Sequence, residues 1–319
     1  MTKFNKIPQY DANHYAVVDL GSNSFHLLII RLHDNEIKTV NKVKRKVRLA
    51  AGLNEHNELS IDALERGLDC LRLFAKHLAT IPLSNIRIVA TATLRIAKNR
   101  NDFLNKANKI LPLAIKLLSG KQEAETIYSG VAHSCKSNLA QKRLVIDIGG
   151  ASTELIIGQG FTTNKAISLN FGCVSFREKY FTNGQLTEDN FAAAINAASR
   201  IIKPISANFI KLGWQSVVGS SGTIQALTEI LFYRQQETII TANFLQEIKG
   251  VLIDCKSIDA IAINNVAFEG LRADRSPVLA SGLCILIALF NCLQLKELKL
   301  STGALREGLL FEMLSIQNK

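Results

Sequence analysis

The sequence predicts an α/β protein built from two similar halves. The chain has 319 residues, enough for one large domain or two of ordinary size. Short apolar runs typical of strands alternate with segments of helical periodicity. A motif also repeats, as DLGSNSFHLLI from Asp19 and as DIGGASTELII from Asp147, each time at the end of an apolar run. The repeat indicates two halves that each present the same kind of turn. Paired halves of this kind bind ligands in the cleft between them.

Each half should contain strands followed by helices. In the first half we expect strands over 15–20, 25–32 and 35–50, a helix from Ser60, a strand over 86–93, and helices near 99–111 and from 122. In the second half we expect strands over 143–148 and 154–158, a helix near 187–211, a strand and turn over 215–223 followed by a helix, a helix over 276–293, a strand over 296–301 and a helix from Gly303. The strand over 35–50 should carry Lys44, Lys46 and Arg48 on one face.

The composition points to a globular protein with a polyanionic partner. With 47% hydrophobic and 20% charged residues, the chain resembles proteins that bury a sizeable core. Its net charge of +11 favours a partner rich in negative charge. We expect no nucleic acid, because basic and aromatic residues do not interleave. The six cysteines form no Cys-x-x-Cys pair and the N-terminus lacks an apolar signal region, so a cytoplasmic protein with reduced thiols is expected.

The segment from Ser276 to Leu295 contains no charged residue and is long enough to span a bilayer. Ser281, Gly282 and Asn291 interrupt its apolar character. We therefore expect a helix buried in the core and no membrane association.

Three turns combine glycine with hydroxyl residues and are candidate phosphate-binding loops. Glycine allows backbone N–H groups to approach an anion, and serine and threonine add donors. The third turn also begins a helix, whose N-terminus attracts anions. The candidate phosphate-binding residues in these turns are Gly21, Ser22, Asn23, Ser24, Gly149, Gly150, Ser152, Thr153, Gly219, Ser220, Ser221 and Gly222.

Carboxylates flank two of these turns. Asp147 and Glu154 are seven residues apart across a turn between strands, so they can face one site, and paired carboxylates with substrate phosphates suit Mg²⁺. For Asp19 the sequence leaves open whether it braces its turn or binds metal. Glu123 lies in the first turn of a predicted helix, where an acidic residue also compensates the helix dipole. Arg95 suits either a phosphate grip or a surface ion pair, and His26 is expected to pack beside the first turn.

Several segments together resemble one family. DLGSNSFHLLI, KRKVRLAAGLN, ATATLR, SGKQEAETIYSGVAH, DIGGASTELIIG, NFGCVSF, GSSGTIQAL and STGALREG, in order from residue 19 to residue 308, resemble the exopolyphosphatase / guanosine-pentaphosphate phosphohydrolase (Ppx/GppA) family. VRLAAGLN, ATATLR and GGAST resemble the guanosine-pentaphosphate branch. The resemblance implies two ribonuclease-H-like lobes of the actin, hexokinase and heat-shock-chaperone ATPase superfamily. Residues 1–128 with 305–319 would form one lobe, and 129–304 the other.

The resemblance also implies roles for individual residues. Glu123, in SGKQEA, would be the catalytic base that activates water, and Asp147 and Glu154 would bind Mg²⁺, with Mn²⁺ as an alternative. Asn23, Ser24 and Arg95 would hold the phosphate chain, and Arg306 would lie near the ligand. Longer members of the branch carry a further helical C-terminal region, whereas this chain ends at Lys319, so a homodimer and processive action on long polymers remain open.

The expected activity is hydrolysis of guanosine pentaphosphate (pppGpp) to ppGpp and phosphate, a step of stringent-response alarmone metabolism. Release of terminal phosphate from inorganic polyphosphate is the alternative. A kinase of the same superfamily would need an acceptor pocket and an aspartate base, for which no candidate stands out. A non-catalytic sensor of the alarmone or polymer is less favoured because Glu123 is retained.

Overall fold

The chain forms two compact units. The computed structural model describes residues 9–34, 36–135, 139–262 and 268–317. Unit 1 comprises Met1–Ser119 and Arg306–Lys319, and unit 2 comprises Gly120–Leu305. The sequence placed the boundary after residue 128. In the structure it lies before helix α4 (Gly120–Ser134), because this helix packs on strands of the second sheet.

Within the described residues, unit 1 contains a sheet of five strands in the order β3-β2-β1-β4-β5. The strands are β1 (His14–Leu20), β2 (Ser24–His33), β3 (Glu36–Lys46), β4 (Ile86–Ala90) and β5 (Lys116–Leu117). β1, β2 and β3 form an antiparallel meander, and β4 pairs parallel with β1 on its other side. The turn between β1 and β2 is the first of the three glycine–hydroxyl turns.

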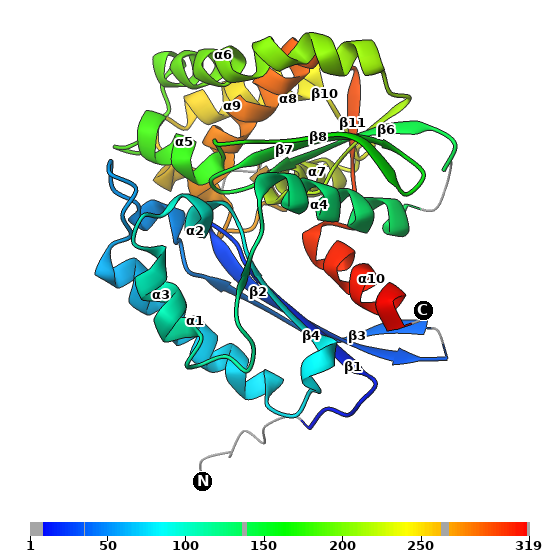
Figure 1. The fold of residues 1–319 in the computed structure, drawn as a ribbon. Coiled ribbons are helices and arrows are strands. Elements are labelled where there is room, and N and C mark those ends of the chain that lie inside the picture. Colours follow the sequence, from blue (N-terminus) through cyan, green and yellow to red (C-terminus); the bar gives the residue numbers. More distant parts are fainter. Residues whose placement is uncertain (1–8, 35, 136–138, 263–267, 318–319) are drawn as a thin grey trace. The chain divides into compact units, whose positions relative to one another are not determined.

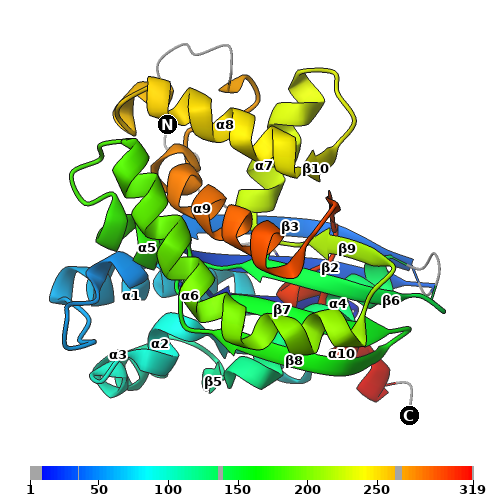
Figure 2. The same cartoon turned by 90° about the horizontal axis from the view of Figure 1, so that it is seen from above.

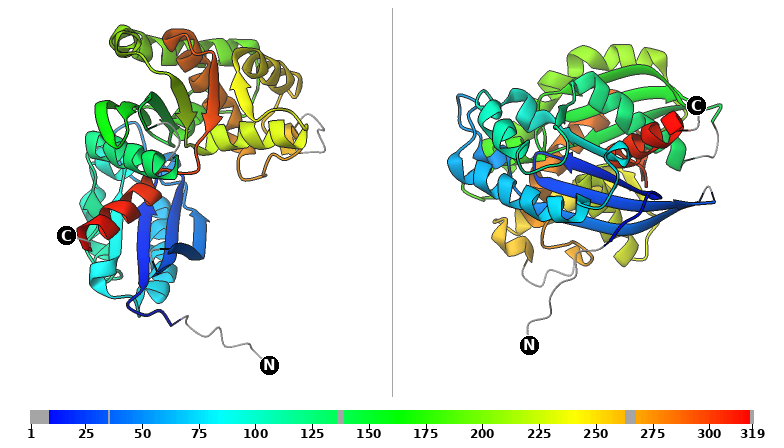
Figure 3. Two further views of the ribbon diagram at one scale, coloured as in Figure 1. Left: turned by 90° about the vertical axis from the view of Figure 1, so that its right-hand side faces the viewer. Right: turned by 60° about the horizontal axis from the view of Figure 1, so that its bottom comes forward.

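Helices cover both faces of this sheet (Figures 1 and 3). The helices of unit 1 are α1 (Ile61–Leu78), α2 (Ala92–Ile96), α3 (Arg100–Ala107) and α10 (Leu305–Gln317). The Ser60 hydroxyl caps α1 by accepting from the Ala63 N–H at 3.3 Å, as the sequence predicted. Alternate residues of β1 and β2, among them Val18 and Leu27, pack with α1 and α3 into one core, while α10 lies along the sheet.

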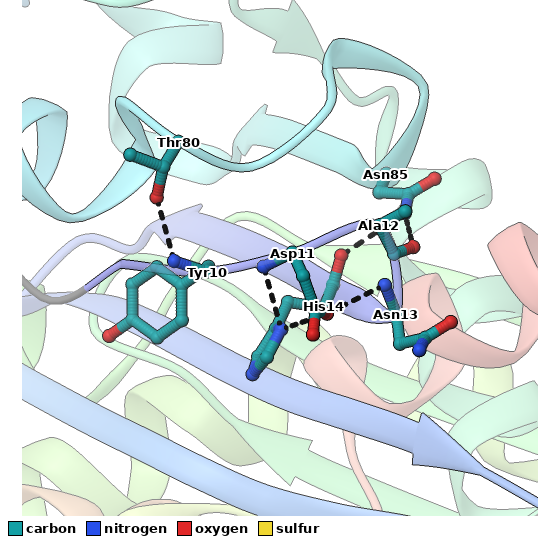
Figure 4. Close-up of polar contacts among 7 residues, drawn as sticks. All are labelled: Tyr10, Asp11, Ala12, Asn13, His14, Thr80 and Asn85. Carbon is teal, nitrogen blue, oxygen red and sulfur yellow. Dashed lines mark hydrogen bonds and ion pairs between the residues drawn. The ribbon is translucent and has the colours of Figure 1, made fainter.

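Polar contacts fix the start of β1 (Figure 4). The Asn85 side-chain amide donates to the carbonyls of Ala12 and His14 at 2.9 and 3.1 Å. The Asp11 carboxylate accepts from the Asn13 N–H at 2.9 Å and lies 2.7 Å from Nδ1 of His14. These bonds tie the chain entering β1 to the segment that precedes β4, and so help to set the register of the two parallel strands.

Unit 2 repeats the same topology. Among its described residues there are six strands, in the order β10-β11-β9-β6-β7-β8. They are β6 (Lys142–Ile148), β7 (Thr153–Gln159), β8 (Thr162–Leu169), β9 (Ser216–Gly219), β10 (Ile239–Thr241) and β11 (Glu297–Leu300). β6, β7 and β8 form an antiparallel meander and β9 pairs parallel with β6, as β4 does with β1. The shared order confirms the two-lobed fold expected from the repeated motif.

The helices of unit 2 form layers around its sheet (Figure 2). They are α4, α5 (Cys173–Tyr180), α6 (Glu188–Leu212), α7 (Gly222–Tyr233), α8 (Ala242–Asp254) and α9 (Ser276–Leu293). α4 packs against β7 and β8, and α6 packs along α9. The uncharged segment thus forms helix α9. Of this helix, 83% is buried inside the protein, as expected for a core helix.

Two local expectations were wrong. The strand expected over 35–50 ends at Lys46, and Arg48 has φ of 52°, so Arg48 does not share a strand face with Lys44 and Lys46. The strand expected over 86–93 ends at Ala90, and residues 92–96 form α2. After Lys46 the chain leaves the sheet and bonds to the first turn, since the N–H groups of Val47 and Arg48 donate to the carbonyl of Asn23. After Ala90 it enters α2, where the N–H of Arg95 donates to the carbonyl of Thr91.

Candidate active site

The β6–β7 hairpin places two carboxylates opposite each other. Asp147 near the end of β6 pairs with Glu154 near the start of β7, and Glu154 in turn pairs with Ser168 on β8. Residues at directly opposed positions point to the same face of a sheet, and like charges at such positions are destabilising. The hairpin therefore concentrates negative charge at one point, as the spacing of Asp147 and Glu154 in the sequence suggested.

Glu154 is the most buried member of this group, with 1% of its surface exposed. The Ser168 hydroxyl donates to its Oε1 at 2.7 Å, and Ser152 also hydrogen-bonds to the carboxylate. Burial, followed by the nearby charges of Glu123 and Asp147, raises the pKa of Glu154 well above its usual value. The carboxyl group of Glu154 is therefore more readily protonated than that of an exposed glutamate.

Glu123 joins the pair from a separate element. It lies in the first turn of α4 and only 6% of it is exposed. Its charge acts on Glu154, so the catalytic candidate and the two candidate metal ligands belong to one cluster within unit 2. We call Glu123, Asp147 and Glu154 the carboxylate cluster.

Asp147 is tied to the third glycine–hydroxyl turn. The Ser220 hydroxyl donates to its Oδ2 at 3.0 Å, and the Ser220 N–H donates to the carbonyl of Ile146 at 3.1 Å. The neighbouring Ser221 caps α7 by accepting from the Ile224 N–H at 3.2 Å. The third turn therefore begins a helix, as predicted, and its first serine orients a carboxylate of the cluster.

The turn over 149–152 is held by the N-terminus of α5. The N–H of Cys173 donates to the carbonyl of Gly149 at 2.9 Å, and the N–H groups of Val174 and Ser175 donate to that of Gly150 at 2.9 and 3.1 Å. In a trans peptide the N–H points opposite to the carbonyl. The N–H groups of Gly150 and Ala151 therefore point away from α5, an orientation suited to an anion.

Gly172 makes this arrangement possible. A Cβ at position 172 would lie 2.4 Å from the oxygen of Gly149 and 2.7 Å from the nitrogen of Ala151. Both are backbone atoms of the turn, so a side chain at this position would push the turn away from α5. The requirement for glycine is a close approach of two backbone segments.

The corresponding turn of unit 1 is held in a similar way. The carbonyl of Asn23 accepts from Val47 and Arg48, and that of Ser22 accepts from Ala50 at 2.9 Å. At Gly21, a Cβ would lie 2.9 Å from the oxygen of Ser24. In both units, then, N–H groups from a segment farther along the chain donate hydrogen bonds to carbonyls of the turn.

The two candidate arginines of unit 1 have protein partners. Nη1 of Arg95, on α2, donates to the carbonyl of Leu118 at 3.0 Å. Nη1 of Arg306, on α10, donates to Nδ1 of His26 at 2.5 Å. His26 lies on β2 between Asp19 and Lys44 in the strand register, beside the first turn as expected.

The structure adds residues that the motifs did not reveal. Ser168 lies on a strand that the sequence analysis did not predict. The guanidinium of Arg275 lies against Gly222, where a Cβ would be 2.1 Å from its Cζ. No motif around either residue marks it, since each meets its partner only in the folded chain. Thr153 differs from the expectation. Its buried hydroxyl donates to the carbonyl of Phe171 at 2.8 Å, so the hydroxyl proton that was expected to face a phosphate is already used in this bond.

The donor set at the carboxylate cluster consists of oxygen atoms. Across the described parts of the chain, no group of three or more histidine, cysteine, aspartate or glutamate residues has the geometry to hold a metal ion by itself. A Mg²⁺ ion usually takes one or two carboxylates and completes its shell with water and substrate phosphates. Asp147 and Glu154 fit such a partial set of ligands.

Comparison with known proteins agrees with this fold. The Ppx/GppA phosphatase family model matches residues 28–317. The chain is 50% identical over 299 residues to a guanosine-5′-triphosphate,3′-diphosphate pyrophosphatase of Vibrio parahaemolyticus, and 49% identical over 300 residues to one of Aliivibrio fischeri. Each match covers 94% of this chain and 59% of the relative, so the chain spans less than two thirds of the length of these relatives.

Solved structures resemble the whole chain. An exopolyphosphatase of Cytophaga hutchinsonii superimposes with a TM-score of 0.83 at 21% identity, over 95% of this chain and 98% of the other. The Ppx/GppA family member of Aquifex aeolicus gives a TM-score of 0.77 at 23% identity, over 96% and 99%. At this identity the likeness establishes the fold. With the family match over nearly its full length, the chain belongs to the Ppx/GppA phosphatase family.

Proposed function

We propose that this chain is a phosphoric-anhydride hydrolase that removes the 5′-terminal phosphate of pppGpp, giving ppGpp and phosphate in the cytoplasm. The observation that carries the proposal is the carboxylate cluster, which joins a base candidate to two candidate metal ligands in one compact unit. The pppGpp specificity is supported by the relatives at about 50% identity, which are described as guanosine-5′-triphosphate,3′-diphosphate pyrophosphatases.

In the proposed mechanism, water attacks the terminal phosphorus in line with the leaving oxygen. Glu123 orients the water and takes its proton. The N–H groups of Gly150 and Ala151 donate to the phosphoryl oxygens as negative charge builds on them. Ser152, Ser220, Ser221 and Gly222 are proposed as further phosphate contacts on unit 2, where Arg275 adds positive charge beside Gly222.

The residues of unit 1 are proposed to bind the rest of the phosphate chain. Gly21, Ser22, Asn23 and Ser24 offer a turn like that of unit 2, and Arg95 and Arg306 add guanidinium groups. Their present bonds to Leu118 and His26 each use one guanidinium nitrogen, and an arginine has five N–H donors in all.

Mg²⁺ is the proposed cofactor, with Mn²⁺ as an alternative, held by Asp147 and Glu154. When bound, it would neutralise charge on the phosphate oxygens. The hydroxyls of Ser220 and Ser168 donate to the two carboxylates, which limits the ways in which the carboxylates can turn.

Inorganic polyphosphate is the second candidate substrate. The observation in its favour is the outer strand β3, which carries the exposed cations Lys38, Lys42, Arg45 and Lys46 next to the strand that follows the first turn. A polyphosphate needs only charge and backbone donors, whereas pppGpp also needs a place for its base and ribose.

Replacement of the proposed base should abolish most of the turnover. Glu123→Gln should keep the fold and KM but lower kcat about 10²–10⁴-fold, the usual contribution of a positioned general base. Steady-state phosphate release, with circular dichroism as a check on folding, measures this. Near-normal turnover in the folded variant would refute the role of Glu123.

Divalent metal should both activate and stabilise the protein. Dialysis against EDTA should remove activity, and Mg²⁺ should raise the melting temperature, because a ligand that binds only the folded state stabilises it by about 2.7 kcal/mol at 100 times its Kd. Glu154→Gln should raise the melting temperature of the metal-free protein by relieving repulsion, and should reduce the shift caused by Mg²⁺. The control is Glu237→Gln, at an exposed site. An unchanged shift in the Glu154 variant would contradict metal binding there.

The turn over 149–152 should lose its function when Gly172 is replaced. Gly172→Ala forces a Cβ against the turn, so we expect kcat/KM to fall by about 10²-fold, as a displacement of about 1 Å can cause. Gly250→Ala is the matched control, because its added Cβ would have no atom within 4 Å other than its chain neighbours and the backbone of its own helix. Equal activity of the two variants would show that the turn does not position substrate.

The substrate preference follows from parallel kinetics. We expect a higher kcat/KM for pppGpp than for long-chain polyphosphate, with the 5′ γ-phosphate released and the 3′-diphosphate intact. Salt should raise KM for both, since it screens attraction between a basic surface and a polyanion. Anion-exchange chromatography identifies the products. A strong preference for polyphosphate would favour an exopolyphosphatase, and release from the 3′ side a different nucleotide hydrolase.

A further inference from the structure

Helix α4, which carries Glu123, is bonded to the tip of the β7–β8 hairpin. The hydroxyl of Tyr128 donates to the carbonyl of Gly160 at 3.1 Å. Gly160 lies in the turn between the two strands and has φ of 57°, a conformation that favours glycine. Tyr128 is only 1% exposed, and its hydrogen bond to the hairpin turn is partly buried.

The ring of Tyr128 also requires a glycine beneath it. A Cβ at Gly158 would lie 2.2 Å from Cζ of Tyr128, so the ring rests directly on the backbone of β7. The register of β7 with β8 shifts between Ile157 and Gly158, at the same point. The ring of Tyr128 on α4 thus packs on Gly158, at the point where the pairing of β7 with β8 is irregular.

A second contact joins the same two elements one to two turns farther along α4. The ring of His133 lies 4.6 Å from the ring of Phe161, centroid to centroid. Nδ1 of His133 donates to the carbonyl of Ser129 at 2.8 Å, which fixes the orientation of the imidazole. Phe161 is 54% exposed, so this contact contributes less than that of Tyr128 but acts in the same direction.

These contacts join the two elements that carry Glu123 and Glu154. Glu123 is five residues before Tyr128 on α4, about 7.5 Å along the helix axis. Glu154 is four residues before Gly158 on β7, about 13 Å along the strand. A shift or rotation of α4 against the hairpin would therefore change the position of Glu123 relative to Glu154. Burial raises the pKa of Tyr128, so its hydroxyl stays protonated and able to donate at neutral pH.

We propose that Tyr128 is a positioning residue for the reaction: its bond to Gly160 and its contact with Gly158 hold α4 so that Glu123 is correctly placed against Asp147 and Glu154. Tyr128 does not touch the substrate and acts through Glu123. This inference rests on the proposed function, since it assumes that Glu123 is the base.

The test is a double-mutant cycle on the full chain. Wild type, Tyr128→Phe, Glu123→Gln and the double variant are assayed for phosphate release from pppGpp and from polyphosphate. Tyr128→Phe should lower kcat by about 10-fold to 100-fold, with KM changed less than about twofold, because a misplacement of about 1 Å can cost 10²-fold in rate. In the Glu123→Gln background the same substitution should have no further effect on kcat, since coupled residues are non-additive.

Two further variants separate positioning from general loss of stability. Tyr233→Phe removes a hydroxyl from a side chain that is 55% exposed, and should leave kcat unchanged. Phe161→Ala loosens the same hairpin from an exposed position, and should lower kcat less than Tyr128→Phe does, again only when Glu123 is present. If Tyr128→Phe unfolds below the assay temperature, the prediction for Phe161→Ala decides the proposal.

The outcomes distinguish the two proposals. Wild-type kcat for Tyr128→Phe and Phe161→Ala, with a strongly impaired Glu123→Gln, would overturn the role of Tyr128 and leave the proposed function standing. Equal losses of kcat in both backgrounds would show that Tyr128 acts independently of Glu123, and would also overturn the inference. Full activity of Glu123→Gln on both substrates would refute the proposed base and, with it, the positioning role.

Discussion

The repulsion between closely placed carboxylates is the constraint on which the proposed site in unit 2 depends. Asp147 and Glu154 occupy opposed positions of one hairpin, and Glu123 reaches the same point from α4. Removal of carboxylates from water is costly unless hydrogen bonds or cations compensate. The fold supplies hydroxyl donors at Glu154 and Asp147, from Ser168 and Ser220.

The two units show how one topology can carry different sets of side chains. In both, a meander of three strands places three side chains in a row next to the turn. In unit 2 the row is Asp147, Glu154 and Ser168, and in unit 1 it is Asp19, His26 and Lys44. The duplicated backbone thus presents two carboxylates in the row of unit 2, whereas the row of unit 1 combines one carboxylate with a histidine and a lysine.

Close contacts with the backbone hold the turn over 149–152 and helix α4 of unit 2 in place. α5 is bonded to the turn over 149–152 through carbonyls, and Gly172 lets the two approach. Gly158 does the same for the ring of Tyr128 on α4. In each case a glycine allows a close contact that a methyl group would prevent. The positions of the proposed site residues therefore depend on glycines that bear no side-chain chemistry of their own.

The sequence alone determined the duplicated α/β plan, the buried nature of α9 and the local placement of Asp147 and Glu154. These follow from short-range patterns: apolar periodicity, glycine turns, and a spacing of seven residues that a hairpin turns into a cross-strand pair. Only the tertiary structure decided the partners of these residues. Ser220 is 73 residues from Asp147, and Ser168 lies 14 residues beyond Glu154 on a strand that the sequence pattern did not reveal. Gly172 and Arg275 likewise contact residues that are distant in the chain, and only these contacts show why the two residues matter. Contacts of this kind depend on how strands and helices pack in three dimensions, which local periodicity does not encode.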